Sequence, residues 1–345
     1  MQLFVDRGES LAQWAEDKYF PTSEKIGTSD SGPTSLKIAL VNNMPDAAVE
    51  DTEAQFCRLL SRAMHGVQVR VRLYTLPRVP RAENLQRYLR NNYADFSDLF
   101  NHRFDGVIIT GTEPRQTDLK KEPYWSELAD LLNWAEENTT STILSCLAAH
   151  ASVLHGDGII RTPLPHKRFG VFAYEKLGEH LLTRGTPDAV RFPHSRWNDL
   201  RERDLKSAGY TVLTRSSEFG VDSFVKQKNR SLFLHFQGHP EYEAQTLFKE
   251  YRRDVRRYLR GERDNYPSLP HDYFGQAERD LLNNFQTTAI AGRSEATMEL
   301  FPSEGCFAAL QNGWHESANQ IYGNWLGYLS LRKKEQFTRS LRVTA

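Results

Sequence analysis

A cysteine followed by small apolar residues, and a histidine followed two positions later by a glutamate, are the residues best suited to nucleophilic chemistry. Cys146 follows an apolar run and precedes the helix-like segment 147–155. His239 and Glu241 lie in the stretch Gly-His-Pro-Glu, directly after another apolar run. A nucleophilic thiol needs a nearby base, and the base needs a carboxylate that orients it. These three residues together predict a catalytic triad.

The sequence around Cys146 favours a strand-to-helix turn. A nucleophile on such a turn projects at the edge of a sheet. The unpaired N–H groups and the positive dipole end of the following helix favour the thiolate, and they can also hold a developing oxyanion. The alternative interpretation of Cys146 is a small buried residue at a strand end, and that of His239 is a structural turn.

Three other histidines compete with His239 for the role of base. His235 alternates within an apolar strand-like segment, whereas His150 and His155 lie in the segment that follows Cys146. Pro240 favours an extended backbone at His239, so that Glu241 can point the same way as the imidazole. We therefore expect His239 to be the base.

The elements that must position these residues alternate between strands and helices in the first half of the chain. Short β-branched runs predict strands, and apolar residues at helical spacing predict helices. Strands are expected at residues 36–41, 67–76, 104–110 and 142–145, and helices at 52–64, 84–92, 124–137 and 147–155. This alternation predicts an α/β fold with a mostly parallel, doubly wound sheet and helices on both faces. Gly111, Thr112 and Cys146 fall at carboxyl ends of strands, where such sheets place their chemistry.

The second half of the chain has a more mixed pattern. Strands are expected at residues 169–175, 210–215, 219–227 and 231–236, and helices at about 243–259 and 315–334. Residues 261–312 are expected to be rich in loops. A short helix is expected at residues 10–18, within a polar lead-in.

Composition and charge argue against several classes of function. The 44 Lys and Arg residues balance 44 Asp and Glu residues, so no global attraction to nucleic acid or anionic lipid is expected. No apolar run reaches the ~18–20 residues of a membrane span, and no secretory signal is expected. Three cysteines make no disulfide framework, which indicates a cytoplasmic protein. No metal-site spacing and no phosphate-binding loop is recognisable, so we expect no bound metal.

The segments around the triad resemble a known family. SCLAAHA and GHPEY resemble the Cys and His-x-Glu elements of the class I glutamine amidotransferase-like fold. Further stretches resemble the homoserine O-succinyltransferase family, namely LKIALVNNMP, TEAQFCRLL, FDGVIITG, YWSEL, LLTRG, PHSRW, GHPEYEAQTLFKEYRRDV and NWLGYL.

This resemblance covers roughly residues 36–274 and 311–330, and it implies four segments. A lead-in at 1–35 precedes an amidotransferase-like acyltransferase domain at 36–274. An insertion of unknown role follows at 275–310, and a C-terminal helical extension at 311–345 packs on the same domain.

The resemblance also implies an activity, an acyl-CoA-dependent O-acylation of L-homoserine. Cys146 takes a succinyl or acetyl group from the corresponding CoA ester, with no other bound cofactor, and passes it to the homoserine hydroxyl. His239 is the general base and Glu241 orients it. The backbone N–H of Leu147, with a group near Thr112, forms the oxyanion hole.

Substrate-binding roles follow from the same resemblance. Arg253 matches the arginine that grips the substrate carboxylate, although a solvated helix charge is its alternative interpretation. Ser195 and Arg196 match a segment that lines the same pocket, with a polar loop as the alternative. The family also implies a homodimer, for which the Trp- and Tyr-rich final helix is a candidate contact surface.

The sequence departs from the usual family pattern on the donor side. Leu147 stands where the family usually has Trp, and Arg115 aligns with the position that sorts acetyl from succinyl donors. Arg115 would pair with a succinyl carboxylate or would indicate another donor. Acylation of serine or another hydroxy amino acid, an amidotransferase-like hydrolase and a non-catalytic module stay open as alternatives.

Overall fold

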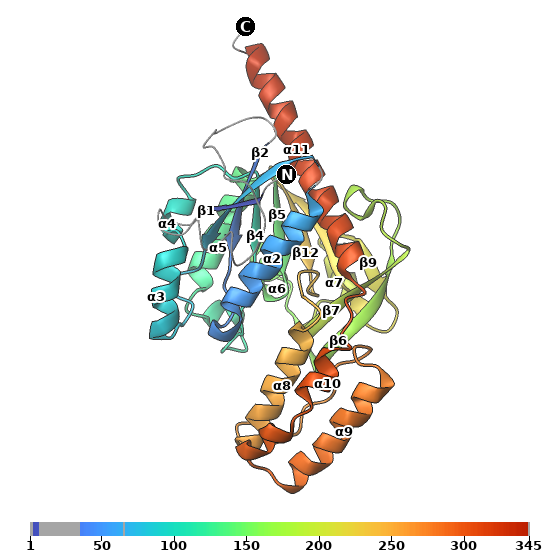
Figure 1. The fold of residues 1–345 in the computed structure, drawn as a ribbon. Coiled ribbons are helices and arrows are strands. Elements are labelled where there is room, and N and C mark those ends of the chain that lie inside the picture. Colours follow the sequence, from blue (N-terminus) through green and yellow to red (C-terminus); the bar gives the residue numbers. More distant parts are fainter. Residues whose placement is uncertain (1–2, 7–34, 65, 344–345) are drawn as a thin grey trace.

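An eight-stranded sheet forms the centre of the protein in the computed structural model, which describes residues 3–6, 35–64 and 66–343 (Figure 1). The strand order is β1-β3-β2-β4-β5-β12-β11-β8. Neighbours from β1 to β12 are parallel, whereas β11 pairs antiparallel with both β12 and β8. The strands are β1 (Leu3–Asp6), β2 (Ser35–Val41), β3 (Gln68–Tyr74), β4 (Gly106–Ile109), β5 (Ser141–Ser145), β8 (Thr211–Val212), β11 (Ser223–Lys228) and β12 (Ser231–Phe236). The predicted mostly parallel α/β sheet is confirmed.

Helices cover both faces of this sheet. Successive residues of a strand point to opposite faces, so Ile38 and Leu40 pack toward α2 (Val49–Ala63) and α11 (His315–Val343). Ala39 and Val41 belong to a separate core on the other face, which includes α5 (Trp125–Asn138) and α6 (Leu147–Asp157). Burial on both faces explains why these strands read as continuous apolar runs. The shorter helices nearby are η1 (Asp46–Ala48), α3 (Glu83–Asn92), α4 (Phe96–Leu99) and η2 (Leu119–Lys121).

A second, antiparallel sheet of four strands was not foreseen from the sequence. Its order is β10-β9-β6-β7. Its strands are β6 (Thr162–Lys176), β7 (Ala189–Asp199), β9 (Thr214–Ser216) and β10 (Gly220–Val221), accompanied by η3 (Leu181–Thr183) and α7 (Glu202–Ser207). The expected strands 210–215 and 219–227 are each divided between the two sheets, because the chain changes sheet at residues 213 and 222.

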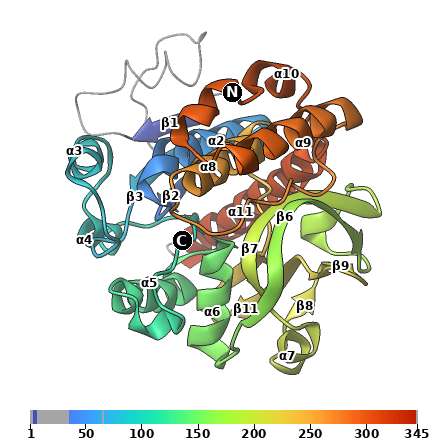
Figure 2. The same ribbon diagram turned by 90° about the horizontal axis from the view of Figure 1, so that it is seen from below.

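Residues 261–312 contain more helix than expected. α9 (Gln276–Ala291), η4 (Glu295–Leu300) and α10 (Ser303–Phe307) lie together with α8 (Thr246–Leu259) beyond one end of the sheet (Figures 1 and 2). The prediction of a loop-rich segment was therefore wrong. Leu282, Phe285 and Ala289 of α9 are buried at helical spacing, and Phe285 packs edge-on against Phe301 with ring centroids 5.0 Å apart.

The final helix, α11, is longer than expected and packs directly on the sheet. Trp325 is fully buried, and its indole N–H donates a hydrogen bond of 2.9 Å to Ser141 Oγ of β5. A Cβ atom at Gly106 of β4 would lie 2.6 Å from the Trp325 ring, so glycine is required for this approach. The aromatic residues Tyr322 and Trp325 thus belong to the core. They do not form the surface that was expected to meet a second chain.

The remaining findings concern the N-terminal segment and the possibility of a membrane-spanning helix. The helix expected at residues 10–18 lies outside the described residues. Among the described helices, none combines the length and the apolar character needed to cross a membrane.

Candidate active site

Cys146 occupies the turn between β5 and α6 in a backbone conformation that is rare for its residue type. Its φ is 52° and its ψ is −112°. Non-glycine residues seldom adopt positive φ, and such strain is concentrated at functional sites. The Cys146 N–H continues the sheet ladder by donating a 2.8 Å hydrogen bond to the Phe236 carbonyl of β12. Two neighbouring strands therefore hold the strained turn in place.

The end of β4 approaches the first turn of α6 very closely. A Cβ atom at Gly111 would lie only 2.8 Å from the backbone nitrogen of Leu147. Leu147 begins α6, so its N–H is one of those left without a partner inside the helix. Leu147 and Thr112 line the same cavity as Cys146. The structure thus brings both residues predicted for the oxyanion hole next to the thiol.

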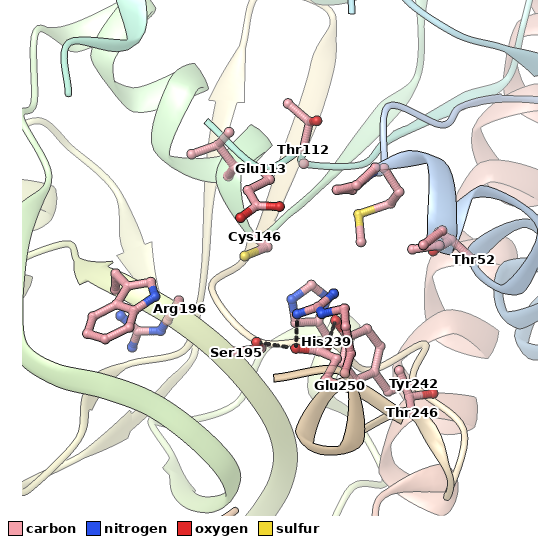
Figure 3. A pocket seen from close by; sticks show the side chains of 18 of the residues that line it. Thr52, Thr112, Glu113, Cys146, Ser195, Arg196, His239, Tyr242, Thr246 and Glu250 are labelled. Atoms are coloured by element: carbon pink, nitrogen blue, oxygen red, sulfur yellow. Dashed lines mark hydrogen bonds and ion pairs between the residues drawn. The ribbon is translucent and has the colours of Figure 1, made fainter. Parts of the chain in front are cut away.

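His239 lies near Cys146 in Figure 3, and both His239 and Glu241 are buried. His239 Nδ1 and Glu241 Oε1 are 2.8 Å apart. Because a carboxylate only accepts hydrogen bonds, Nδ1 carries the proton. Nε2 is then the ring nitrogen left for Cys146, which lines the same cavity as His239 and helps to raise its pKa. Ser145 Oγ donates a 3.3 Å hydrogen bond to the same Glu241 oxygen. Cys146, His239 and Glu241 therefore form a connected chain.

The electrostatics of this chain favour a protonated imidazole. Burial alone lowers the pKa of His239, but the negative charges of Cys146 and Glu241 and their hydrogen bonds raise it well above its ordinary value of 6.5. The Tyr242 ring stacks on the imidazole, with ring centroids 4.2 Å apart and planes inclined by 17°. The arrangement suits an imidazolium paired with a thiolate.

The three competing histidines contact other residues, and burial lowers the pKa of each of them. Burial lowers the pKa of His235 to about 3, and its ring stacks on Phe224 inside the sheet. Burial likewise lowers the pKa of His150 to about 3, and its Nε2 is 2.9 Å from Gln237 Oε1. His155 Nε2 lies 2.8 Å from Asn133 Oδ1. Of these three, only His150 lines the cavity.

The cavity in front of Cys146 has a volume of about 700 Å³. On the side opposite Cys146, Glu250 of α8 accepts hydrogen bonds from Ser195 Oγ at 2.6 Å and from the Tyr242 hydroxyl at 2.8 Å (Figure 3). Arg253 lies one turn further along α8, 3.3 Å from Asp254 and 3.9 Å from Glu250. The predicted residues Ser195 and Arg253 thus share one polar wall.

Lys167 is a pocket residue that the sequence analysis missed. Its Nζ lies 3.4 Å from Asp254 and 3.7 Å from Glu250, so it faces Arg253 across two carboxylates. The residue stands in β6, within the second sheet. No spacing in the sequence distinguished this lysine from other surface lysines, because only the packing of β6 against α8 brings it to the cavity.

Arg196 lines the cavity, but most of its guanidinium group pairs with other residues of the protein. Its Nη1 lies 3.0 Å from Asp199 Oδ1, and its Nε donates a 3.1 Å hydrogen bond to His194 Nδ1. Its buried Nη2 has no hydrogen-bond partner within the described part of the chain. The guanidinium is therefore held mainly by groups of the protein itself.

Arg115 does not belong to the set of cavity-lining residues. The Arg115 backbone N–H donates to Glu122 Oε1 at 2.5 Å, and the cavity wall nearby is formed by Glu113 and Pro114. The basic residue on this side of the cavity is Arg161, which follows α6. Burial lowers the pKa of Arg161, and the negative charge at Cys146 is among the groups that partly offset this effect.

The described residues contain no cluster of three or more histidine, cysteine, aspartate or glutamate side chains that would hold a metal ion.

Comparisons with known proteins agree on one family. The profile of the homoserine O-succinyltransferase family, HTS, matches residues 15–336. Homoserine O-succinyltransferase of Rhodopseudomonas palustris is 46% identical over 291 residues, which cover 84% of this chain and 87% of the relative. The protein of the same name from Methylorubrum extorquens is 42% identical, covering 86% of this chain and 88% of the relative.

Among solved structures, a glutamine amidotransferase from Methylobacillus flagellatus is similar to this chain, with a TM-score of 0.47 and a sequence identity of 16%. The match covers 86% of this chain and 95% of that structure. The sequence matches span most of the chain and most of each relative. The chain belongs to the homoserine O-succinyltransferase family.

Proposed function

We propose that this protein transfers a succinyl group from succinyl-CoA to the hydroxyl of L-homoserine through a thioester on Cys146. Membership in the family supports the donor and the acceptor. The observation that carries the mechanism is that Cys146 and His239 line one cavity of about 700 Å³, with Glu241 2.8 Å from His239 Nδ1.

In the first half-reaction the Cys146 thiolate attacks the carbonyl carbon of the CoA thioester. The negative charge that develops on the carbonyl oxygen is stabilised by the free N–H groups at the start of α6, including that of Leu147. The carbon–sulfur bond to CoA then breaks, and the CoA thiolate takes the proton of the His239 imidazolium. The result is a succinyl thioester on Cys146 and a neutral imidazole.

In the second half-reaction the homoserine hydroxyl attacks the thioester carbonyl. The neutral His239 takes the hydroxyl proton as the new carbon–oxygen bond forms. The bond to the Cys146 sulfur breaks, and the thiolate leaves beside a protonated His239. This step restores the ion pair with which the cycle began.

The polar wall opposite Cys146 suits an amino acid as the acceptor. Arg253 and Lys167 offer positive charge to the carboxylate, and Glu250 offers negative charge to the ammonium group. Ser195 is fixed by its hydrogen bond to Glu250, which makes it a positioned contact for the substrate. A single methylene changes binding by only ~1–3 kcal/mol, so serine is the competing acceptor that a test must include.

On the donor side, Arg161 supports a succinyl group over an acetyl group. Its guanidinium lines the same cavity as Cys146, Thr112 and Glu113. A guanidinium binds a carboxylate bidentately, and a succinyl group carries such a carboxylate whereas an acetyl group does not. The role that the sequence predicted for Arg115 is thus better filled by Arg161.

The test is intact-protein mass spectrometry after brief mixing with succinyl-CoA, acetyl-CoA or glutamine in the absence of acceptor. We expect an adduct of succinyl mass on the wild-type protein and none on the Cys146→Ala variant. Homoserine should discharge the adduct to O-succinylhomoserine faster than serine does. Alkylation of the wild-type thiol controls for an intact site.

Other outcomes would contradict the proposal. Discharge by serine alone would assign a different acceptor. An acetyl adduct alone would assign a different donor. Glutamate release from glutamine, without an adduct from either CoA ester, would establish the amidotransferase-like hydrolase.

We also propose a homodimer in the cytoplasm. The outer part of α11, which extends away from the sheet in Figure 1, exposes Leu331 and Phe337 to solvent at 57% and 51%. Exposed apolar side chains on a projecting helix suit a contact with a second chain. Sedimentation velocity measures the mass of the protein in solution. A mass of two chains would support the dimer, and a mass of one chain would contradict it. We propose the cytoplasm because all three cysteines are free, as is usual in proteins of a reducing compartment.

A further inference from the structure

A second cavity, of about 660 Å³, lies between α8 and α10. Its wall contains six basic side chains, all of them from α8, against a single acidic one, Glu304. The six are Lys249, Arg252, Arg253, Arg256, Arg257 and Arg260. We call this cavity the α8 groove. Figures 1 and 2 show α8 and α10 next to each other beyond the end of the sheet.

The α8 groove adjoins the cavity of Cys146. Lys249, Arg253 and Arg257 line both cavities. Residues four apart lie on the same face of a helix, so these three side chains form a row along α8. From Arg253 to Arg260 the helix rises by roughly 10 Å, at about 1.5 Å per residue. A ligand that enters the groove can therefore continue toward the thiol.

Part of the positive charge in the groove is held in no ion pair with a described residue, although the hydrogen bond from Arg260 and the charge of Arg256 both lower the pKa of Glu295. Arg257 lies 3.6 Å from Glu262, and Arg260 pairs with Glu295. Arg252 and Arg256, by contrast, form no ion pair with any described residue, and Arg252 lies over the Phe301 ring, 6.0 Å from its centroid. Like charges four residues apart destabilise a helix. An anionic ligand between α8 and α10 would remove this repulsion.

The groove also offers an apolar surface beside the guanidinium groups. Phe307 of α10 lines the groove and is 55% exposed, and Phe248 of α8 lies near it, with ring centroids 6.5 Å apart. Exposed aromatic rings next to arginines are the surface on which a nucleobase stacks in sites that also bind phosphate.

We propose that the α8 groove binds the phosphorylated nucleotide end of the acyl-CoA donor. This inference rests on the proposed function, because it takes the donor to be a CoA ester. Coenzyme A ends in an adenosine 3′-phosphate 5′-diphosphate, and guanidinium groups bind phosphate oxygens bidentately. The long pantetheine arm then leads past Arg253 to Cys146. The segment 275–310 thereby acquires a role, because its helix α10 supplies the second wall of the groove.

The experiment compares the wild-type chain with the double variant Arg252→Ala/Arg256→Ala. Binding of adenosine 3′,5′-bisphosphate is measured by calorimetry, which does not depend on catalysis. We expect the dissociation constant to rise by roughly a hundredfold in the variant, about tenfold for each guanidinium–phosphate interaction removed. Arg279→Ala, in an exposed part of α9 outside the groove, is the matched control and should bind like the wild type.

A kinetic comparison separates donor binding from folding. With succinyl-CoA, the double variant should show a KM raised by a similar factor. With succinyl-N-acetylcysteamine, a thioester that lacks the nucleotide, its kcat/KM should stay within about twofold of the wild type. An equal loss with both thioesters would assign Arg252 and Arg256 a structural role and overturn the proposal.

The calorimetry has two outcomes that would contradict binding of the nucleotide in the α8 groove. Absence of bisphosphate binding to the wild-type protein, or equal binding to the double variant, would overturn the proposal. Displacement of the bisphosphate by an equal concentration of inorganic phosphate would reduce the groove to a general anion site. If the wild-type protein transfers no acyl group from either thioester, the proposed function fails, whereas the calorimetry still reports on the groove.

Discussion

At the scale of single residues, the proposed nucleophile is a cysteine that the backbone holds under strain. A positive φ at a non-glycine residue costs about 1–3 kcal/mol, and Cys146 adopts it between two paired strands. The conformation places the thiol between His239 and the first N–H groups of α6. The same imidazole is fixed from its far side by Glu241 at 2.8 Å. Cys146 is thus positioned by the turn between β5 and α6, whereas His239 and Glu241 are both positioned by the segment that follows β12.

Replacing Arg161 with alanine tests the donor preference at this scale. Because the guanidinium is expected to pair with the succinyl carboxylate, kcat/KM for succinyl-CoA should fall by about 10- to 100-fold in Arg161→Ala. The value for acetyl-CoA should change little. Steady-state kinetics with both donors measures the ratio. Arg115→Ala serves as the control, and a change of the ratio in that variant alone would restore the role first predicted for Arg115.

At the scale of elements, the close approach of β4 to α6 forms the side of the cavity where we propose the oxyanion hole. Gly111 permits this approach, because a side chain there would meet the backbone of Leu147. The opposite wall is built by α8, whose Glu250 connects Ser195 of β7 with Tyr242. The cavity therefore lies where the two sheets and α8 meet, and its lining residues come from several elements.

Gly111→Ala should damage catalysis more than folding. The new Cβ atom would lie 2.8 Å from Leu147 N and must displace the first turn of α6. We expect kcat to fall by about a hundredfold or more, as for the loss of an oxyanion-hole donor. Gly313→Ala, where no atom lies within 4 Å of the new Cβ, is the matched control. Near-normal turnover in Gly111→Ala, measured at saturating donor, would argue against an oxyanion hole at this place.

At the scale of the whole molecule, the core encloses histidines that folding keeps neutral. Burial lowers the pKa of His150 and His235 to about 3 and that of His194 to about 4. The unfolded chain binds protons at these positions below its ordinary pKa of about 6.5, whereas the folded protein does not. Their contribution to stability is therefore present above pH 6.5 and is lost as the pH falls toward 4. His239 acts in the opposite direction, because its pKa is raised.

The free energy of unfolding should accordingly decrease between pH 6.5 and pH 4.5. Each histidine contributes a slope of up to about 1.4 kcal/mol per pH unit. His235→Gln should make the decrease shallower by up to this amount, whatever its effect at pH 7.5. Urea denaturation at several pH values gives the slopes, and His166→Gln, at an exposed position, is the matched control. Parallel profiles for wild type and His235→Gln would show that this histidine does not contribute.

The sequence alone determined the alternating strands and helices, because apolar periodicity reports local burial. It therefore predicted the mostly parallel sheet and the positions of Cys146 and His239 at strand ends. It did not predict α9, because the few apolar residues of this helix are buried only against the aromatic cluster around Phe301. Nor did it predict the second sheet, because β6 and β7 pair along much of their length and their burial follows no simple period.

Only the tertiary structure decided which polar residues share the cavity. Lys167 and Arg161 line it, while Arg115, which the sequence favoured, is outside it. The reason is physical: whether a charged side chain faces solvent or a cavity depends on how separate elements pack, and that packing leaves no periodic trace around the residue itself. Cys146 and His239, the proposed nucleophile and base, were recognisable because each follows an apolar strand, whereas the charged residues around them were not.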